Sequence, residues 1–311
     1  MGYIVEVDHG SAYELLYSFG AFADKVQYIE LGTAWAKSVR EQLSAEFLKK
    51  LAQFKKQRHK QKSDLVFYFC DLLVWQCPRG RNATEFLGWL HEIQPKEIKQ
   101  YILPWLRPGE SLPPNFEEIG SQFIDLLTEW NDQYFTSIPS EILEGLQADG
   151  EEKRRRIGEQ SPEELIEQAT NGIRFAPIDR EFRIVLIPQY HCVPVNIYSH
   201  YKGMYMIGYP CDALPTAEDE PPPSLLRLTR GLADKNRLRI LRFLAEGPRS
   251  FMEIVRHVNL AKSTTHHHLI ALRSAGLVQL QTSVLGSNDR YILRTSALDK
   301  LELHIRKFLE V

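Results

Sequence analysis

The sequence predicts a mostly α-helical α+β protein of two domains joined by a proline-rich linker. Apolar residues recur at three- and four-residue spacing over most of the chain, and β-branched residues gather between residues 182 and 209. Three consecutive prolines stand at Pro221–Pro223. A chain of 311 residues is also longer than one typical small domain. We therefore expect an N-terminal domain over residues 1–217, a linker over 218–224 and a C-terminal domain over 225–311.

The expected N-terminal domain is helical and carries a small antiparallel β element. Amphipathic helices are predicted over residues 11–23, 33–56, 63–77, 84–93 and 116–135. Ser161 followed by Pro162 marks one further helix start. A short strand is predicted over residues 3–7. Segments 182–188, 193–199 and 204–209 should form two or three antiparallel strands, with Lys202-Gly203 as a turn.

Charge is divided unevenly between the two expected domains. Residues 1–220 carry 23 Lys and Arg against 33 Asp and Glu, whereas residues 221–311 carry 15 against 7. A basic module next to an acidic one predicts that the C-terminal domain meets a polyanion. Charge alone leaves DNA, RNA and anionic lipid as alternatives.

Several function classes are not expected from the sequence. No apolar run approaches the roughly 20 residues that span a bilayer, and the first residues show no signal-peptide pattern. We therefore expect a cytoplasmic protein without a membrane partner. Residues 1–220 contain no GxGxxG, GxxxxGK[ST], GxSxG or HExxH motif, so we expect no catalytic residues, no cofactor and no enzyme activity.

Residues 225–311 carry a helix-turn-helix pattern. The first helix follows Asp234 as N-cap and ends before Gly247, and the second follows Ser250. A short turn over residues 259–262 leads to a third helix, predicted to run from Ser263 to Ala275. Two short helices joined by a tight turn are typical of DNA-binding modules of this kind.

Two strands and a terminal helix complete a predicted winged helix. Residues 277–282 and 290–293 can pair as a wing, with residues 286–289 at the loop tip. Ser296 and Asp299 fit a capping box at the start of the terminal helix. The apolar side of that helix, with the residues Leu298, Leu301, Ile305 and Phe308, must cover either its own domain or a partner subunit, where it would form a dimer seam.

Rotation of the third helix by 100° per residue indicates which side chains face outward when Leu269 and Leu272 face the core. The predicted DNA contacts are Lys262, Ser263, Thr264, His266, His267, Ala271 and Arg273, together with Arg290 of the wing. Hydroxyl groups near a helix start suit phosphates, and His267 has the reach for a base edge. Three adjacent histidines point 100° apart and cannot converge on one ion, so we expect no metal site. His268 is instead expected to be a hydrogen-bonded core residue.

These segments resemble the ArsR-type winged-helix repressors. Leu232–Leu241 is similar to the opening of that module, and Ser263–Leu269 with Leu272–Val278 is similar to its recognition helix and first wing strand. Lys235 stands where a proline is common, and His266 stands where a serine is usual. The resemblance implies a homodimer built from the first and last helices of the module. It does not imply metal sensing, because residues 250–259 lack the cysteine pair of the metal-responsive members.

The leading interpretation is a transcriptional regulator, of repressor type, that binds a near-palindromic operator in double-stranded DNA as a dimer. Its N-terminal domain would sense a small-molecule effector or a protein partner. All five tryptophans lie in the first 135 residues, which favours an aromatic core and leaves a ligand cavity open as an alternative. The N-terminal domain is otherwise a structural dimerisation or protein-docking module, or an enzyme with a DNA-binding tail.

Overall fold

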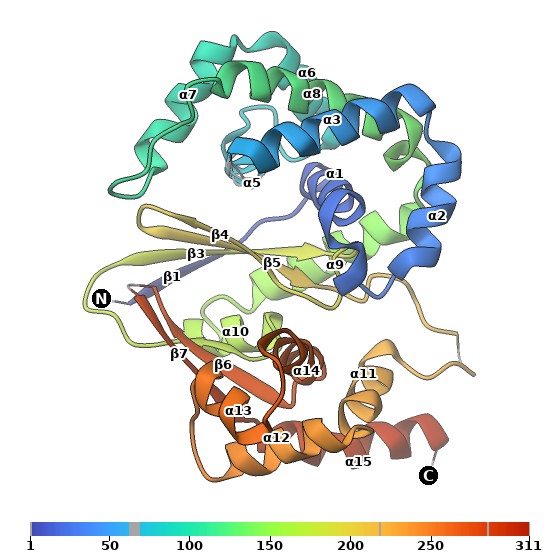
Figure 1. Cartoon of the computed structure of the whole chain (residues 1–311), viewed down its shortest axis with the longest axis vertical. Helices are drawn as coiled ribbons and strands as arrows, with labels where there is room; N and C mark the ends of the chain where they lie inside the picture. Colours follow the sequence, from blue (N-terminus) through green and yellow to red (C-terminus); the bar gives the residue numbers. More distant parts are fainter. Residues whose placement is uncertain (1, 62–68, 218, 285, 311) are drawn as a thin grey trace. The chain divides into compact units, whose positions relative to one another are not determined.

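The computed structural model describes residues 2–61, 69–217, 219–284 and 286–310 (Figure 1). The chain forms two compact units. The first, here the C-terminal unit, consists of Met1–Tyr3, Arg156–Arg180 and Pro215–Val311; the second, here the N-terminal unit, consists of Ile4–Arg155 and Glu181–Leu214. The structure divides the chain at Pro215, three residues before the predicted start of the linker at residue 218, and a helix begins at Pro223, within the residues predicted as linker. The assignment of residues 156–180 differs, because the sequence placed them in the N-terminal domain.

Helices make up most of the N-terminal unit, and eight α-helices are named among its described residues. Seven of them are α1 (Ser11–Gly20), α2 (Gly32–Gln42), α3 (Ala45–Gln61), α5 (Cys70–Gln76), α6 (Ala83–Glu92), α7 (Pro95–Ile102) and α8 (Phe116–Gln133). An eighth, α9 (Ser140–Arg155), has an acidic residue in its first turn and basic residues in its last. A π-helical turn, Ala21–Lys25, extends α1. Residues 63–68 of the helix predicted over 63–77 lie outside the described residues, and α5 covers residues 70–76 of the remainder.

The single helix predicted over residues 33–56 is wrong, since the structure has two helices there. Leu43 lies between α2 and α3 with extended backbone angles, φ −85° and ψ 142°. The Ser44 Oγ then accepts a hydrogen bond from the backbone N–H of Phe47 at 3.1 Å, as an N-cap does. The apolar periodicity continues across this break, which explains why periodicity alone did not reveal it.

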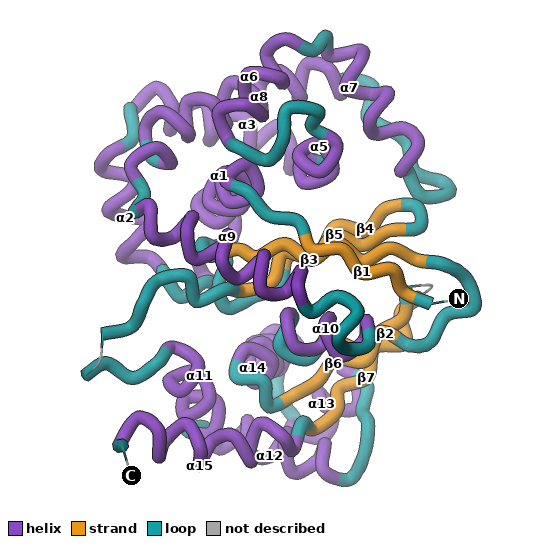
Figure 2. The backbone as a smooth tube through the Cα atoms, turned by 180° about the vertical axis from the view of Figure 1, so that it is seen from behind, coloured by secondary structure: helices purple, strands orange, loops and turns teal. Residues whose placement is uncertain are grey.

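A mixed four-stranded sheet, in the order β1-β3-β5-β4, supports the helices of the N-terminal unit (Figure 2). Its strands are β1 (Tyr3–Val7), β3 (Phe182–Gln189), β4 (Ile197–Tyr201) and β5 (Met204–Pro210). The β4–β5 hairpin is antiparallel, as predicted. The prediction of a purely antiparallel element is wrong, because β3 and β5 pair in parallel. The strand β5 lies between β3, which runs in the same direction, and β4, which runs in the opposite direction.

Two buried polar groups tie the sheet to the helices of the N-terminal unit. Glu14 on α1 and His191 after β3 are both almost fully buried, with Glu14 Oε1 2.5 Å from His191 Nδ1. The His191 Nε2 lies 2.8 Å from the Tyr134 hydroxyl. The backbone N–H groups of Tyr190 and His191 also donate to the Glu14 carboxylate. Every oxygen of this buried carboxylate therefore has a partner, as burial of a charge requires.

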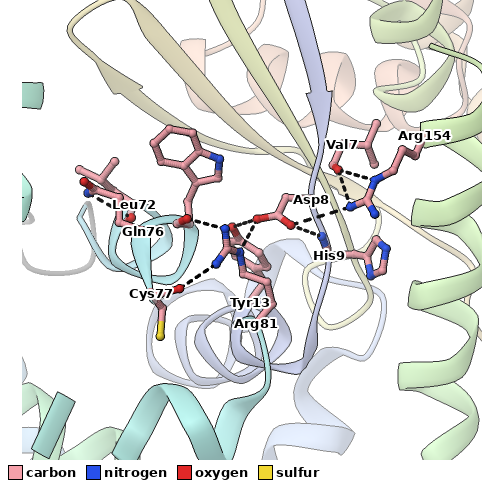
Figure 3. A network of polar contacts seen from close by, with 10 residues as sticks. Val7, Asp8, His9, Tyr13, Leu72, Gln76, Cys77, Arg81 and Arg154 are labelled. Atoms are coloured by element: carbon pink, nitrogen blue, oxygen red, sulfur yellow. Dashed lines mark hydrogen bonds and ion pairs between the residues drawn. The ribbon is translucent and has the colours of Figure 1, made fainter. Parts of the chain in front are cut away.

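A second network fixes the end of β1 (Figure 3). The Asp8 Oδ2 lies 2.6 Å from Arg81 Nε and accepts a hydrogen bond from the Tyr13 hydroxyl at 2.7 Å. Arg81 Nη1 also donates to the Cys77 carbonyl at 3.1 Å, and Arg154 of α9 donates to the Val7 carbonyl at 2.8 Å. One strand end thus connects α1, the α5–α6 turn and α9.

The C-terminal unit combines helices with a three-stranded sheet in the order β2-β6-β7. Its elements are α10 (Pro162–Ala169), β2 (Ile173–Phe175), α11 (Pro223–Leu232), α12 (Lys235–Ala245), α13 (Phe251–Val258), α14 (Lys262–Ser274), β6 (Val278–Ser283), β7 (Gly286–Leu293) and α15 (Thr295–Leu309). The strands β6 and β7 pair antiparallel, whereas β2 pairs in parallel with β6. In neither unit does a described helix combine the length and the apolar character needed to cross a membrane.

Residues 167–176 belong structurally to the helix-turn-helix region, although they precede it by about 60 residues or more in the sequence. The Leu280 N–H donates to the Gly172 carbonyl, and the Ala176 N–H donates to the Thr282 carbonyl, both at 2.8 Å. Asn171 Nδ2 donates to the Ser274 carbonyl at the end of α14 at 3.0 Å. These contacts fix the C-terminal end of α14 from outside its own segment.

Asn171 also holds the residue that leads into α15. Arg294 Nη1 donates to the Asn171 Oδ1 at 3.1 Å, and Arg294 Nε lies 3.2 Å from Glu167 Oε1. The side chains of Arg294 and Glu167 are 15% and 20% exposed, so this ion pair is more shielded than a surface pair. One asparagine side chain therefore joins the end of α14 to the start of α15.

Substitution of Asn171 tests this joint. Asn171 has a φ of 55°, which glycine adopts without strain and alanine does not. We expect Asn171→Gly to lower the free energy of unfolding by about 1–2 kcal/mol through its lost hydrogen bonds. Asn171→Ala should cost roughly 1 kcal/mol more, through added backbone strain. Urea unfolding of the variants measures both; equal stability of wild type and Asn171→Gly would contradict the assigned role.

Candidate nucleic-acid interface

The helix α13 begins with a reciprocal capping box, as the sequence predicted for Ser250. The Ser250 Oγ accepts from the Glu253 N–H at 3.4 Å, and the Glu253 Oε2 accepts from the Ser250 N–H at 2.8 Å. The hydrogen bonds from the Ser250 hydroxyl and backbone, helped by the charge of Arg290, lower the pKa of Glu253 to about 2. The helix start therefore carries a carboxylate that stays ionised over the physiological range.

A three-residue turn separates α13 from α14. Asn259 terminates α13 in the left-handed conformation, with φ 55° and ψ 49°, and its N–H donates to the Val255 carbonyl at 3.1 Å. Leu260 and Ala261 complete the turn, and α14 starts at Lys262. Asparagine tolerates this backbone conformation better than most residues, so the sequence itself sets a tight turn here.

Apolar side chains pack α13 and α14 against the rest of the unit. Ile254 and Val258 from α13 and Leu269 and Leu272 from α14 are all at most 2% exposed. They share one core with Ile240 of α12 and with residues of β6 and β7. Burial of side chains of this size contributes about 1.5–3 kcal/mol each, before the entropy of ordering them is counted. The outward face of α14 is thereby fixed.

The start of α14 differs from the prediction. Ser263 was expected to be its N-cap, but Ala261, two residues earlier, occupies the cap position without a side-chain hydrogen bond, and the helix begins at Lys262. The Thr265 hydroxyl is buried and donates to the Ala261 carbonyl at 3.1 Å. Ser263 therefore lies inside the first helical turn, where its hydroxyl is exposed rather than used by the helix end.

Most of the predicted contact residues share one exposed surface of α14. Thr265, Leu269 and Leu272 are buried, as a helical rotation of 100° per residue requires. The exposed residues are Lys262, Ser263, Thr264, His266 and His267, and the half-buried ones are Ala271 and Arg273. The structure thus brings seven predicted residues onto one helix, with the longest exposed side chains in its first two turns. We call these seven residues the α14 face.

His268 lies on the inner side of α14 but makes no close hydrogen bond to the residue it faces. Its side chain is 14% exposed, and its Nδ1 lies 3.7 Å from the Asp234 Oδ1. Asp234 instead accepts the Arg237 N–H at 2.9 Å, as the predicted N-cap of α12. This backbone hydrogen bond, followed by the charges of Arg237 and His268, lowers the pKa of Asp234. The prediction of a core residue holds only in part, because His268 is half-buried at the edge of the core, and 3.7 Å is too long for the expected hydrogen bond.

Arg290 projects from β7 and already has an acidic partner. Its Nη1 lies 2.8 Å from Glu253 Oε2, and the two side chains are 46% and 34% exposed. Exposed ion pairs are worth about 0–1 kcal/mol, so a phosphate can replace Glu253 at little cost. Arg290 thereby couples the β6–β7 hairpin to the start of α13.

The hairpin is longer than predicted, and a contact that the sequence did not indicate anchors it. Residues 286–289, expected at the loop tip, belong to β7. The Thr282 Oγ1 donates to the Asp289 Oδ1 at 2.6 Å across the hairpin. Arg249 and Tyr291 exchange both backbone hydrogen bonds, at 3.0 and 2.7 Å. The segment before α13 therefore pairs with β7.

The terminal helix α15 lies beside α11 and leaves part of its apolar side uncovered. Leu298 is 39% and Ile305 is 36% exposed, whereas Leu301 and Phe308 are half-buried. Leu301 packs against the core of its own unit. The predicted capping box at Ser296 and Asp299 is wrong, because α15 starts at Thr295 with Arg294 in the cap position. Hydrogen bonds of Arg294 to other segments hold this start instead.

A search for metal-ligating clusters gives none among the described residues. The three histidines on α14 differ in exposure, since His266 and His267 are exposed and His268 is half-buried. They therefore face different surroundings, as their spacing predicts.

Comparison with known proteins identifies one segment. Residues 234–279 match the family model described as "Bacterial regulatory protein, arsR family". The matched residues include α12, α13, α14 and the first two residues of β6. Curated proteins and solved structures yield no match to the chain. The resemblance that the sequence motifs indicated is therefore confirmed for the C-terminal module.

The capping box of α13 predicts a pH-dependent stability. Since folding lowers the pKa of Glu253 from its usual 4.5 to about 2, its stabilising contribution is complete above about pH 4.5 and is lost as the pH falls toward 2. Glu253→Gln keeps a capping side chain without the charge. The difference in melting temperature between wild type and this variant should therefore shrink below pH 4.5. Glu302→Gln, at an exposed residue that caps no helix, is the control; a constant difference for Glu253→Gln would contradict the assignment.

Proposed function

We propose that the protein is a transcriptional regulator that binds double-stranded DNA through a winged helix, with α14 as the recognition helix. The observation that supports this most directly is the α14 face, on a segment that matches the arsR family model. Residues 221–311 carry 15 basic against 7 acidic residues, which suits a polyanionic partner. Among polyanions, the helix-turn-helix geometry favours duplex DNA, whose major groove admits one helix.

Six of the seven residues of the α14 face have a role that follows from their positions. Lys262, Ser263 and Thr264 lie in the first turn, where side chains and helix-terminal N–H groups suit phosphates. His266 and His267 lie one turn further on and reach base edges. Arg273 lies near the opposite end of the helix and binds the DNA backbone. Arg290 exchanges Glu253 for a phosphate beside the hairpin, which acts as the wing.

The regulator acts as a homodimer on a near-palindromic operator. Two copies related by a two-fold axis would place their α14 helices in successive major grooves, with half-sites about 34 Å apart. The exposed part of α15, with Leu298, Ile305 and the half-buried Phe308, is the surface that the partner copy would cover. A repressor acts in this way by occupying the operator in the cytoplasm.

The N-terminal unit is proposed to sense an effector and to act without enzyme activity or a cofactor. The chain leaves this unit at Arg155 and returns to it at Glu181, so both ends of segment 156–180 are tied to it covalently. That segment carries β2 and Asn171, which bond to β6 and to the end of α14. A change in the N-terminal unit therefore has a covalent route to the recognition helix.

Selection of bound fragments from random duplex DNA tests the proposal and yields the operator at once. We expect an inverted repeat with one half-site for each copy of the chain. Recovery of no enriched sequence, together with equal affinity for all duplexes, would contradict sequence-specific regulation.

Variants of α14 should separate base contacts from phosphate contacts. We expect His267→Ala to lose preference at one base pair per half-site, with a cost of about 1–3 kcal/mol on the preferred base. Thr264→Ala should weaken binding to all DNA sequences about equally, because phosphates carry no sequence information. Binding to all single-base variants of the selected operator measures this. His268→Ala, at a half-buried residue, should lower the melting temperature before it changes sequence preference. If His266→Ala loses the preference at one base pair and His267→Ala does not, the assigned orientation of α14 is contradicted.

The dimer surface makes a further prediction. Ile305→Asp would bury a carboxylate without a partner in the proposed seam, which costs several kcal/mol. We expect this variant to be monomeric by light scattering and to bind the operator poorly, and Phe308→Asp to behave similarly. Leu303 lies on the same helix, 62% exposed and about 200° of helical rotation away from Ile305. Leu303→Asp should therefore stay dimeric. The proposed seam is contradicted if Leu303→Asp and Ile305→Asp have the same oligomeric state and the same operator affinity.

A further inference from the structure

A cavity of about 190 Å³ lies among α5, α6, α7 and α8 in the N-terminal unit. Its interior is apolar and strongly aromatic. Four of the side chains that line it, Phe69, Phe86, Phe116 and Phe123, are at most 5% exposed. Apolar cavities of about 150 Å³ stay dry and accept a molecule such as benzene. The space is therefore suited to one small apolar group rather than to water.

The mouth of this cavity is acidic. Glu117, Ser121 and Asp125 follow one another at four-residue spacing on α8 and are exposed. Glu117 Oε1 lies 2.6 Å from Lys99 Nζ, so this carboxylate is already partly neutralised. His91, which also lines the cavity, has its Nε2 2.9 Å from the Thr128 Oγ1. Among the described residues that line the cavity, none is a lysine or an arginine.

We propose that this cavity binds a small amphiphilic cation, an apolar body that carries a protonated amine. The apolar body would fill the aromatic interior, where it replaces an empty space that weakens packing. The ammonium group would remain at the mouth beside Asp125. A carboxylate in the same position would lie beside the Asp125 carboxylate and be disfavoured by like-charge repulsion.

Gly120 offers a way to close the cavity without disturbing its walls. This glycine belongs to the lining, on α8 between Glu117 and Ser121. A Cβ built at Gly120 meets no heavy atom within 4 Å. Gly120→Phe can therefore place a ring at the mouth, whereas Gly120→Ala adds one methyl group and favours the helix. The two variants form a matched pair, since both remove the same glycine.

Titration calorimetry of the full chain with three probes tests the proposal. The probes are 3-phenylpropylamine, 3-phenylpropan-1-ol and 3-phenylpropanoate, which share the apolar body and differ in charge. We expect saturable binding of the amine by wild type and by Gly120→Ala, and affinity at least about tenfold lower for the carboxylate. Gly120→Phe should lose at least about tenfold in amine affinity. Asp125→Asn should lower the affinity for the amine by about two- to fivefold, because an exposed ion pair contributes little to binding.

Three results would overturn the proposal: no saturable binding of the amine at millimolar concentration, equal affinity for amine and carboxylate, or unchanged amine binding by Gly120→Phe. Thermal melting confirms that each variant is folded, so loss of binding by Gly120→Phe with an unchanged melting temperature supports the site. That the ligand acts as the effector rests on the proposed function. The calorimetry contains no DNA, so a failure to bind DNA would contradict the regulator and leave the result on the cavity intact.

Discussion

The position of α14 depends on one asparagine and one short strand from the middle of the chain. Asn171 bonds the last carbonyl of α14 and also receives a hydrogen bond from Arg294 at the entrance to α15. Immediately after it, β2 extends the sheet of the hairpin by pairing in parallel with β6. Backbone groups at a helix end and at a sheet edge need partners. Here segment 156–180 supplies them, so α14, the hairpin and α15 form one body with it.

This arrangement gives the division of the chain a physical meaning. The N-terminal unit holds its own core, in which the Glu14–His191 pair and the Asp8–Arg81 pair join helices to the sheet. It is also continuous with segment 156–180 at both ends. In this chain, the partners of α14 come from a segment whose flanks belong to the proposed sensing unit.

The sequence predicted correctly several features that depend on contacts between neighbouring residues. Asp234 and Ser250 cap α12 and α13 as predicted, because a cap depends on three or four neighbouring residues. The outward face of α14 also followed from helical rotation once Leu269 and Leu272 were placed in the core. Ser263 and Ser296 carry the same kind of signal and do not cap, since Ala261 and Arg294 take those positions. A serine near a helix start therefore indicates the helix better than it indicates the exact first residue.

The features that the sequence did not reveal depend on distant partners. The three residues of β2 have no periodicity to detect, and their pairing with β6 spans more than a hundred residues. The parallel pairing of β3 and β5 likewise joins two strands that β4 separates in the sequence, so neither strand alone indicates it. The ion pair of Arg290 with Glu253 joins two elements of the module, and it changes the expected role of Arg290 from a free phosphate ligand to an exchangeable one.

The salt dependence of duplex DNA binding by the full chain tests the central claim most directly. Each phosphate neutralised by a basic side chain contributes about −0.9 to the slope of log affinity against log salt concentration. We predict a steep negative slope, reduced by about 0.9 in Lys262→Ala, whose side chain lies exposed at the start of α14. A slope near zero, or one that Lys262→Ala leaves unchanged, would contradict DNA binding through this helix.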